Sequence, residues 1–210
     1  PMVRAAHSTG KPALGVGPGN VPAYVDRSAD IPAAAAAIVN SKAFDCSVIC
    51  ATEQSVVADR PIAAQLRAHM EANGAHWIAK EDHAKLAAIL FNAGGAMNPR
   101  SVGQTPQALA AMAGISVPAH ARILVADLDR VGRDEPLSGE KLTTALGFYV
   151  ADGWRDGCER SLELLHYGGD GHSLVIHATD EDVVLQFGLE KPAFRILVNT
   201  WGTLGAIGAT

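Results

Sequence analysis

Apolar residues in this chain gather in short, nearly continuous runs separated by longer stretches of helical pattern. The runs fall at residues 12–16 (PALGV), 23–26 (AYVD), 54–59 (QSVVAD), 76–79 (HWIA), 121–128 (ARILVADL), 173–179 (SLVIHAT) and 194–200 (FRILVNT). A strand that is apolar throughout is buried on both faces, which is typical of a parallel sheet covered by helices. The pattern therefore predicts an α/β fold, a three-layer α/β/α arrangement around a mostly parallel sheet.

Helix signals fill the segments between these runs. Asp30 is an N-cap candidate ahead of Pro32 and an alanine run, which together predict a helix over residues 30–44. Residues 139–152 are ambiguous, with strand character toward 147–151. Further helices are predicted at residues 60–74, 81–95, 105–112, 154–169 and 180–191, and residues 1–10 read as the end of a helix stopped by Gly10.

Composition and charge narrow the possible functions. The chain has 210 residues, 48% of them hydrophobic, and no apolar run approaches the roughly 20 residues of a membrane span. A net charge of -5 and the lack of a basic stripe argue against a nucleic-acid partner. Three cysteines without an export signal favour free thiols in a reducing cytoplasm. The chain opens with Pro1, so we expect a longer parent chain, with a domain boundary near residues 20–25.

Cys46 and Cys50 raise the main chemical question. A metal site is disfavoured because no second Cys or His pair lies at zinc-site spacing, and we predict no metal. Burial as a small apolar residue is the common fate of a free cysteine, and we expect it for Cys158 inside a helix. Cys50, however, lies in a connection between a helix and a strand, where reactive groups tend to occur. Packing and catalysis both stay open for Cys50 on this reasoning, since catalysis needs neighbours that favour the thiolate.

Three other segments carry candidate chemistry. Residues 15–20 (GVGPGN) match a dinucleotide fingerprint poorly, because Pro18 and Pro22 block the helix that must follow the glycines. A tight turn that lets the backbone approach another group is the better interpretation. His172 stands in a glycine-rich turn before a strand, and Glu140 opens a polar segment. Each could equally be structural, His172 as a packed imidazole and Glu140 as a solvated carboxylate.

Six separated stretches together resemble the CoA-acylating aldehyde dehydrogenases, including the aldehyde dehydrogenase half of the bifunctional aldehyde–alcohol dehydrogenases. They occur in the family's order along almost the whole chain. The stretches are KPALGVGPGNVPAYVD, ADIPAAAAAIVNSKAFDCSVICATEQSVV, NPRSVGQTPQALAAMAGISVP, EPLSGEKLTTALGFY, GGDGHSLVIHA and RILVNTWGTLGAIG.

The resemblance implies roles for four residues. Cys50 matches the family's nucleophile, and His172 matches the histidine of its Gly-x-Gly-His motif, associated with acyl transfer. Glu140 matches a glutamate that contacts the nicotinamide ribose, and Gly17 lies in the turn close to the cofactor. The implied activity is reversible oxidation of a short-chain, acetaldehyde-like aldehyde to acyl-CoA, with NAD as cofactor and coenzyme A as co-substrate.

One position bears on the fate of the thioester. Hydrolytic relatives carry a water-activating glutamate in a Leu-Glu-Leu-Gly-Gly segment, and Gly15 stands there in this chain. The resemblance therefore implies transfer to CoA rather than hydrolysis. Cys46, Thr143–Thr144 and Trp201 depart from the family's usual Asn, Ser-Pro and Pro. The last two changes touch the cofactor loop and the acyl pocket.

The resemblance also implies a domain assignment and a setting. Residues 1–20 would be a remnant of the dinucleotide-binding domain and residues 21–210 the cysteine-bearing catalytic domain, so this stretch alone should bind NAD poorly and turn over little. A homo-oligomer in the full-length protein, a cytoplasmic or bacterial-microcompartment location, and neither nucleic-acid nor membrane partners are expected. The alternatives are a hydrolytic aldehyde dehydrogenase, or a non-catalytic truncated homologue or assembly module.

Overall fold

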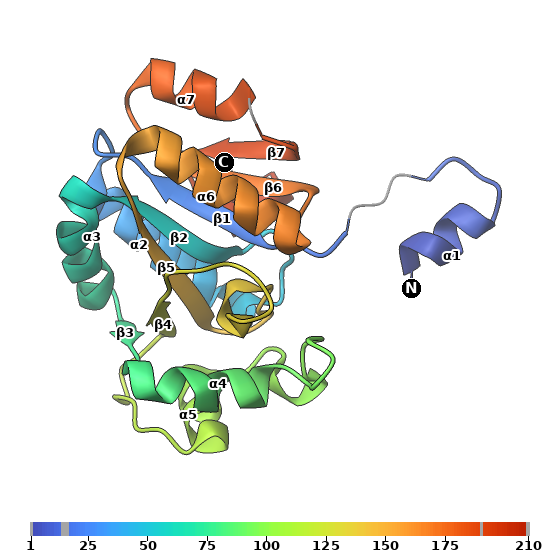
Figure 1. The fold of residues 1–210 in the computed structure, drawn as a ribbon, viewed down its shortest axis with the longest axis vertical. Coiled ribbons are helices and arrows are strands. Elements are labelled where there is room, and N and C mark those ends of the chain that lie inside the picture. The colour runs from blue at the N-terminus through green and yellow to red at the C-terminus, as the bar shows by residue number, and fades with distance from the viewer. Residues whose placement is uncertain (1, 14–16, 190, 209–210) are drawn as a thin grey trace.

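A single parallel sheet forms the centre of the computed structural model, which describes residues 2–13, 17–189 and 191–208 (Figure 1). Its order in this described part is β3-β4-β5-β2-β1-β6-β7, and every neighbouring pair is parallel. The strands are β1 (Val21–Val25), β2 (Glu53–Asp59), β3 (Ala75–Trp77), β4 (Ile123–Asp127), β5 (Ala145–Ala151), β6 (Gly171–His177) and β7 (Ala193–Val198). The predicted α/β class with a parallel sheet is confirmed.

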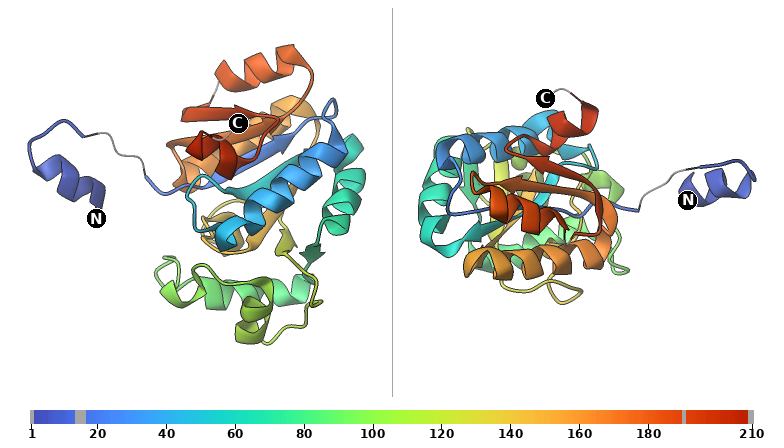
Figure 2. Two further views of the ribbon diagram at one scale, coloured as in Figure 1. Left: turned by 180° about the vertical axis from the view of Figure 1, so that it is seen from behind. Right: turned by 90° about the horizontal axis from the view of Figure 1, so that it is seen from above.

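Helices cover both faces of the sheet, so the molecule has three layers (Figure 2). α2 packs against α3 and α8 on one face, while α6 crosses β1, β2 and β5 on the other and contacts α7. α1 lies apart from these layers in Figures 1 and 2. The helices are α1 (Met2–Ser8), α2 (Ile31–Ala43), α3 (Arg60–Ala72), α4 (His83–Leu90), α5 (Pro106–Ala113), α6 (Gly153–Gly168), α7 (Glu181–Leu189) and α8 (Gly202–Ile207).

The core is split by the sheet into two clusters. Successive residues of a strand point to opposite faces, so Val25 and Val56 join the cluster under α2 and α3. Their neighbours Tyr24 and Val57 join the cluster under α6 and α7. β1 and β2 are buried along their whole length, which explains why their sequences lack polar alternation.

Local signals in the sequence account for the starts of α2 and α5 and for the end of α5. The Asp30 side chain accepts a hydrogen bond from the Ala33 N–H at 3.1 Å and caps α2. Thr105 caps α5 in the same way, and Gly114 ends it with a φ of 66°. The helices predicted at residues 30–44 and 105–112 are therefore confirmed.

Three sequence expectations are wrong or incomplete. The strand predicted at residues 12–16 is absent at residues 12 and 13, and residues 14–16 lie outside the described part. The helix predicted at 81–95 ends at Leu90, because the Asn92 side chain accepts hydrogen bonds from the Gly94 and Ala96 N–H groups and folds a turn there. α8 was not predicted, since its glycines disfavour a helix.

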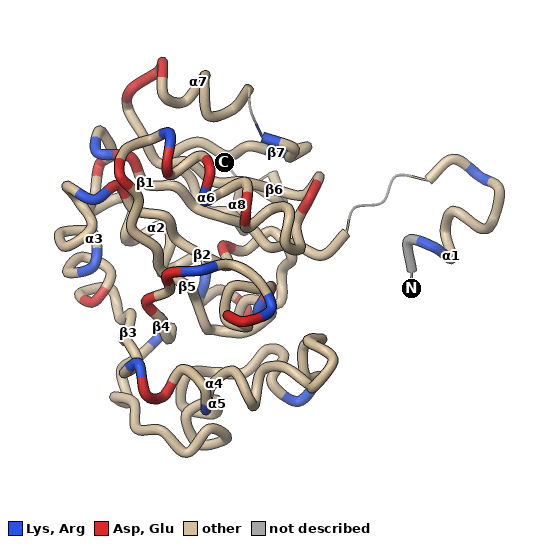
Figure 3. The backbone as a smooth tube through the Cα atoms, viewed as in Figure 1, with Lys and Arg blue, Asp and Glu red and all other residues tan. Residues whose placement is uncertain are grey.

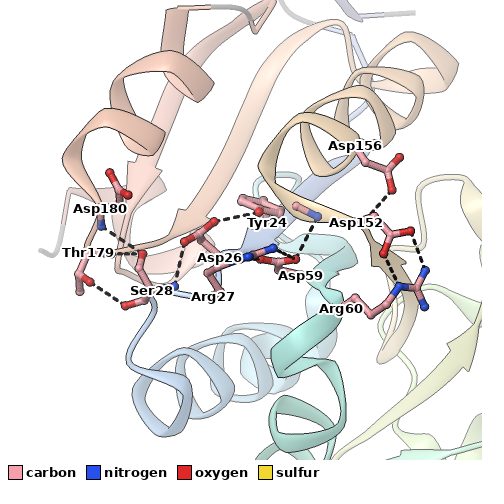
Figure 4. A network of polar contacts seen from close by, with 11 residues as sticks. Tyr24, Asp26, Arg27, Ser28, Asp59, Arg60, Asp152, Asp156, Thr179 and Asp180 are labelled. Carbon is pink, nitrogen blue, oxygen red and sulfur yellow. Dashed lines mark hydrogen bonds and ion pairs between the residues drawn. The ribbon is translucent and has the colours of Figure 1, made fainter.

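Charged residues close the edge at which the parallel strands end (Figure 4). The Arg27 guanidinium donates two hydrogen bonds to the buried Asp59 carboxylate, from Nε at 2.5 Å and from Nη2 at 3.2 Å. The same carboxylate accepts the Gly153 N–H at 3.0 Å, at the start of α6. Arg60 makes a second two-pronged pair with Asp152. Open parallel sheets commonly bind ligands at this edge, but here these polar groups hold the chain's own crossovers.

The wider charge distribution is mixed. Basic and acidic positions are interspersed along the chain trace (Figure 3). Across the described residues, no helix combines the length and apolar character needed to cross a membrane.

Candidate active site

Three segments that precede or open β1, β2 and β6 meet at the amino edge of the sheet. Val21 pairs with Glu53, and Ala23 pairs with Val175, so the starts of these strands lie side by side. Gly19 leads into β1, Cys50 lies in the turn before β2, and His172 is the second residue of β6. The topology therefore gathers residues far apart in sequence.

Gly19 is the point at which the candidate residues converge. A Cβ atom there would lie 2.0 Å from the carbonyl oxygen of Cys50 and 3.3 Å from Cε1 of His172. The Gly19 N–H donates a hydrogen bond to Oε1 of Glu140 at 2.8 Å. Cys50, His172 and Glu140 thus surround one glycine, and only a residue without a side chain permits this approach.

Cys50 is exposed and sits after a strained loop. Asp45, Cys46 and Ser47 take φ values of 48°, 47° and 65°, in the left-handed region that costs non-glycine residues conformational energy. Such strain tends to occur at functional sites. The exposure of Cys50 contradicts the alternative of core packing for this thiol. Cys158 is buried in α6, as expected.

His172 is buried, with 2% of its surface exposed, and its ring meets the Phe194 ring edge-on at 6.0 Å. Burial lowers its pKa, and the positive charge of Arg195 lowers it further. The imidazole is therefore uncharged at neutral pH, a state that can accept a proton. Its Nδ1 has no hydrogen-bond partner among the described residues.

Glu140 stands where a cavity of about 700 Å³ adjoins the site. Burial raises the pKa of its carboxyl group, while the Gly19 N–H and the charges of Lys42 and Lys141 act in the opposite direction. Pro18, Met97, Arg133 and Tyr167 are among the residues lining this cavity. A volume in this range suits a small-molecule or cofactor site.

Unpartnered polar atoms are concentrated at the amino edge. Eight buried side-chain N or O atoms lack a hydrogen-bond partner within the described chain, and six belong to segments at this edge. Buried polar groups are normally paired, so these atoms are available to bind water or a ligand. The six are Asn20 Oδ1, Ser47 Oγ, Thr52 Oγ1, Glu53 Oε2, His172 Nδ1 and Ser173 Oγ.

The structure does not test the remaining sequence candidates. Gly17 is exposed, and a Cβ there would meet nothing within 4 Å, so its cofactor role stays a prediction. Gly15 lies outside the described residues. Gly19 was missed, although the Gly-Pro-Gly-Asn turn before a strand was the available signal. Asn20 was also missed; its Nδ2 donates to the carbonyls of Ser138 and Leu164 and fixes the turn.

The sequence and the structure of this chain were compared with those of known proteins. No protein-family model matches the chain. Aldehyde-alcohol dehydrogenase 2 of Entamoeba histolytica is 41% identical over 216 residues, covering 99% of this chain and 25% of that protein. An acetylating aldehyde dehydrogenase from Geobacillus thermoglucosidasius superposes with a TM-score of 0.96 at 44% identity, covering 100% of this chain and 46% of that one. The chain is homologous to a segment of the acylating aldehyde dehydrogenases.

The acylating aldehyde dehydrogenases include a structure with a modified cysteine. Propionaldehyde dehydrogenase of Rhodopseudomonas palustris was solved with bound CoA and an acylated cysteine; it is 27% identical, with a TM-score of 0.89 over 100% of this chain and 47% of that one. This chain spans about a quarter of the aldehyde-alcohol dehydrogenases and under half of these solved enzymes. Within the described residues, no group of three or more His, Cys, Asp or Glu side chains could hold a metal ion.

Proposed function

We propose that the protein containing this chain oxidises a short-chain, acetaldehyde-like aldehyde to acyl-CoA, reversibly, with NAD and coenzyme A. The observation that carries the proposal is the exposed Cys50 turn packed on Gly19, against which His172 and Glu140 also lie. The acylated cysteine in the propionaldehyde dehydrogenase supports a cysteine nucleophile. The names of the relatives support acyl transfer to CoA.

Cys50 is the proposed nucleophile. Its thiolate adds to the aldehyde carbon, and the carbonyl electrons move to oxygen, where N–H donors stabilise the negative charge. Bound NAD supplies the hydride acceptor for this site. Loss of hydride from the carbon of the adduct re-forms the C=O bond and leaves a thioester on Cys50.

His172 serves the second half of the reaction. The thiol of CoA attacks the thioester carbon, its proton passes to the neutral His172 imidazole, and Cys50 leaves as the thiolate. The sulfur–carbon bond to Cys50 breaks as the bond to CoA forms, so the product is acyl-CoA. Gly15 occupies the place where hydrolytic enzymes carry the water-activating glutamate, so water has no base at that position.

Glu140 and Gly17 are proposed to hold NAD. Glu140 lines the 700 Å³ cavity, and its carboxyl group suits a ribose diol because carboxylate oxygens accept hydroxyl hydrogen bonds. Gly17 is exposed two residues before the Gly19 N–H that orients Glu140. The residues present therefore fit the nicotinamide ribose.

The setting is proposed on the same footing. Residues 1–20 belong to the dinucleotide-binding domain and residues 21–210 to the catalytic domain. The full protein is a homo-oligomer of the cytoplasm or of a bacterial microcompartment. A neighbour at TM-score 0.90, a propionaldehyde dehydrogenase of a Clostridium phytofermentans microcompartment, supports the latter location.

The experiment follows acyl-CoA and free acid by chromatography while NADH absorbance is recorded, using the complete gene product with acetaldehyde. We expect NADH formation that depends on CoA and is abolished by Cys50→Ser. Gly15→Glu should raise the ratio of acid to acyl-CoA. NADH formation without CoA at the same rate, or activity that survives Cys50→Ser, contradicts the proposal.

A further inference from the structure

Two lysines are buried beneath the candidate site. Lys42, in the last turn of α2, is 0% exposed, and Lys141 is 1% exposed. Within the described chain neither side chain forms an ion pair. Burial lowers the pKa of Lys42 well below its ordinary value and that of Lys141 to about 7. Buried lysines of this kind are costly, so their retention needs a reason.

The hydrogen bonds of Lys42 close a ring with Gln54 and the backbone of Lys141. Lys42 Nζ donates to Gln54 Oε1 at 3.0 Å and to the Lys141 carbonyl at 3.2 Å. The Lys141 N–H donates to the same Gln54 Oε1 at 2.8 Å. Both backbone groups of Lys141 are therefore held, one by each side chain.

The ring joins the segments that carry the candidate residues. Gln54 Nε2 donates to the Thr52 carbonyl at 3.1 Å, at the end of the turn that contains Cys50. Lys141 directly follows Glu140, and its own Nζ donates to the carbonyls of Leu137 and Gly139 at 2.6 and 2.7 Å. This ring of hydrogen bonds therefore links the turn that contains Cys50 to the loop that carries Glu140.

We propose that Lys42 and Gln54 are positioning residues for the oxidation half-reaction, because together they fix the backbone beside Glu140 relative to the Cys50 turn. This inference rests on the proposed function, in which Glu140 holds the ribose. Neither side chain touches the reacting atoms in this role. Both act through Lys141, because they hold its N–H and, together with the Thr143 N–H at 2.7 Å, its carbonyl, and so help to set where the Glu140 carboxyl group stands.

The test measures NAD and aldehyde kinetics in the complete gene product carrying Gln54→Leu, Lys42→Met or Gln54→Glu. The first two variants should raise KM for NAD about tenfold, as expected when one or two buried hydrogen bonds are lost. Gln54→Glu keeps the acceptor for both donors but loses the Nε2 donor to the Thr52 carbonyl, so its KM for NAD should lie between those of the wild type and Gln54→Leu. The matched control is Gln107→Leu, since Gln107 fastens a different loop through the carbonyls of Pro118, Ala119 and Ala121.

A second readout separates positioning from general damage. Alkylation of Cys50 by iodoacetamide without NAD should stay within about twofold of the wild-type rate in all variants, because the thiol remains exposed. An unchanged KM for NAD in Gln54→Leu and Lys42→Met overturns the role, as does an equal loss in the Gln107→Leu control or in the alkylation rate. If Gln54→Leu does not fold, Lys42→Met decides the question, because methionine occupies the space of the lysine methylene chain.

The failure of this role differs from the failure of the proposed function. If the wild type is active and depends on CoA, but neither Gln54→Leu nor Lys42→Met changes KM for NAD, only the positioning role is refuted. A folded wild type with no NAD-dependent acylation refutes the proposed function and the positioning role together.

Discussion

Gly19→Ala tests the geometry on which the candidate site depends. The added Cβ would stand 2.0 Å from the Cys50 carbonyl oxygen, whereas real Cβ contacts essentially never fall below 3.0 Å. Relief of this contact needs the Cys50 turn and the Gly19 turn to separate by at least 1.0 Å, the difference between these two distances. A displacement of about 1 Å in a reacting constellation costs on the order of 100-fold in rate.

The assay is kcat/KM for the aldehyde at saturating NAD and CoA in the complete gene product. We expect a fall of roughly 100-fold for Gly19→Ala, with a loss of about 1–3 kcal/mol in the free energy of unfolding from overpacking. Alkylation of Cys50 should persist, since the change does not cover the thiol.

Gly188→Ala in α7 is the matched control. Its Cβ would meet only Ile196 Cδ1 at 3.7 Å, an ordinary van der Waals contact, and its φ lies outside the left-handed region, so the backbone accepts alanine. We expect kcat/KM within about threefold of the wild type. Wild-type kcat/KM in Gly19→Ala would refute the close approach of the two turns.

Three further predictions concern charge, strain and cofactor binding. Burial lowers the pKa of His177 from 6.5 to about 4, so folding stability is complete above pH 6.5 and falls as the pH approaches 4; urea unfolding should show a loss of about 2 kcal/mol between pH 7 and pH 5, less in His177→Gln, and equal slopes would contradict it. Cys46→Asn should raise Tm by about 2–4 °C, since asparagine tolerates the left-handed backbone better; an unchanged Tm argues against strain there. Glu140→Gln should raise KM for NAD about tenfold through loss of a charged acceptor, and titration calorimetry showing wild-type affinity would count against it.

Much of the fold could be predicted because its signals are local. Apolar runs without alternation correspond to strands buried on both faces, and Asp30 and Thr105 cap helices through contacts within one turn. The end of α4 failed because a single side chain, Asn92, outweighed the helix preference of the residues before it. The family resemblance named Cys50 and Glu140, and the structure brings both to Gly19.

The rest of the site depends on tertiary structure. Lysine side chains are normally exposed to water, so the burial of Lys42 in α2 could not be predicted from its residue type. No local pattern indicates that Lys141 is buried either. The choice of edge was also invisible, because residue order alone does not say which ends of the strands meet. Only the register of β1 with β2 and β6 places Gly19 beside Cys50 and His172.

The ion pairs at the carboxyl edge of the sheet imply that mutations at the two edges affect different properties of the protein. Asp59 and Arg27 bind crossovers there, so damage to this pair should appear as thermal lability and sensitivity to salt, with turnover at low temperature preserved. Damage near Gly19 should lower turnover even at low temperature. In a mutational scan, substitutions at the carboxyl edge of the sheet should therefore mainly lower thermal stability, and substitutions at the amino edge of the same strands should mainly lower the reaction rate.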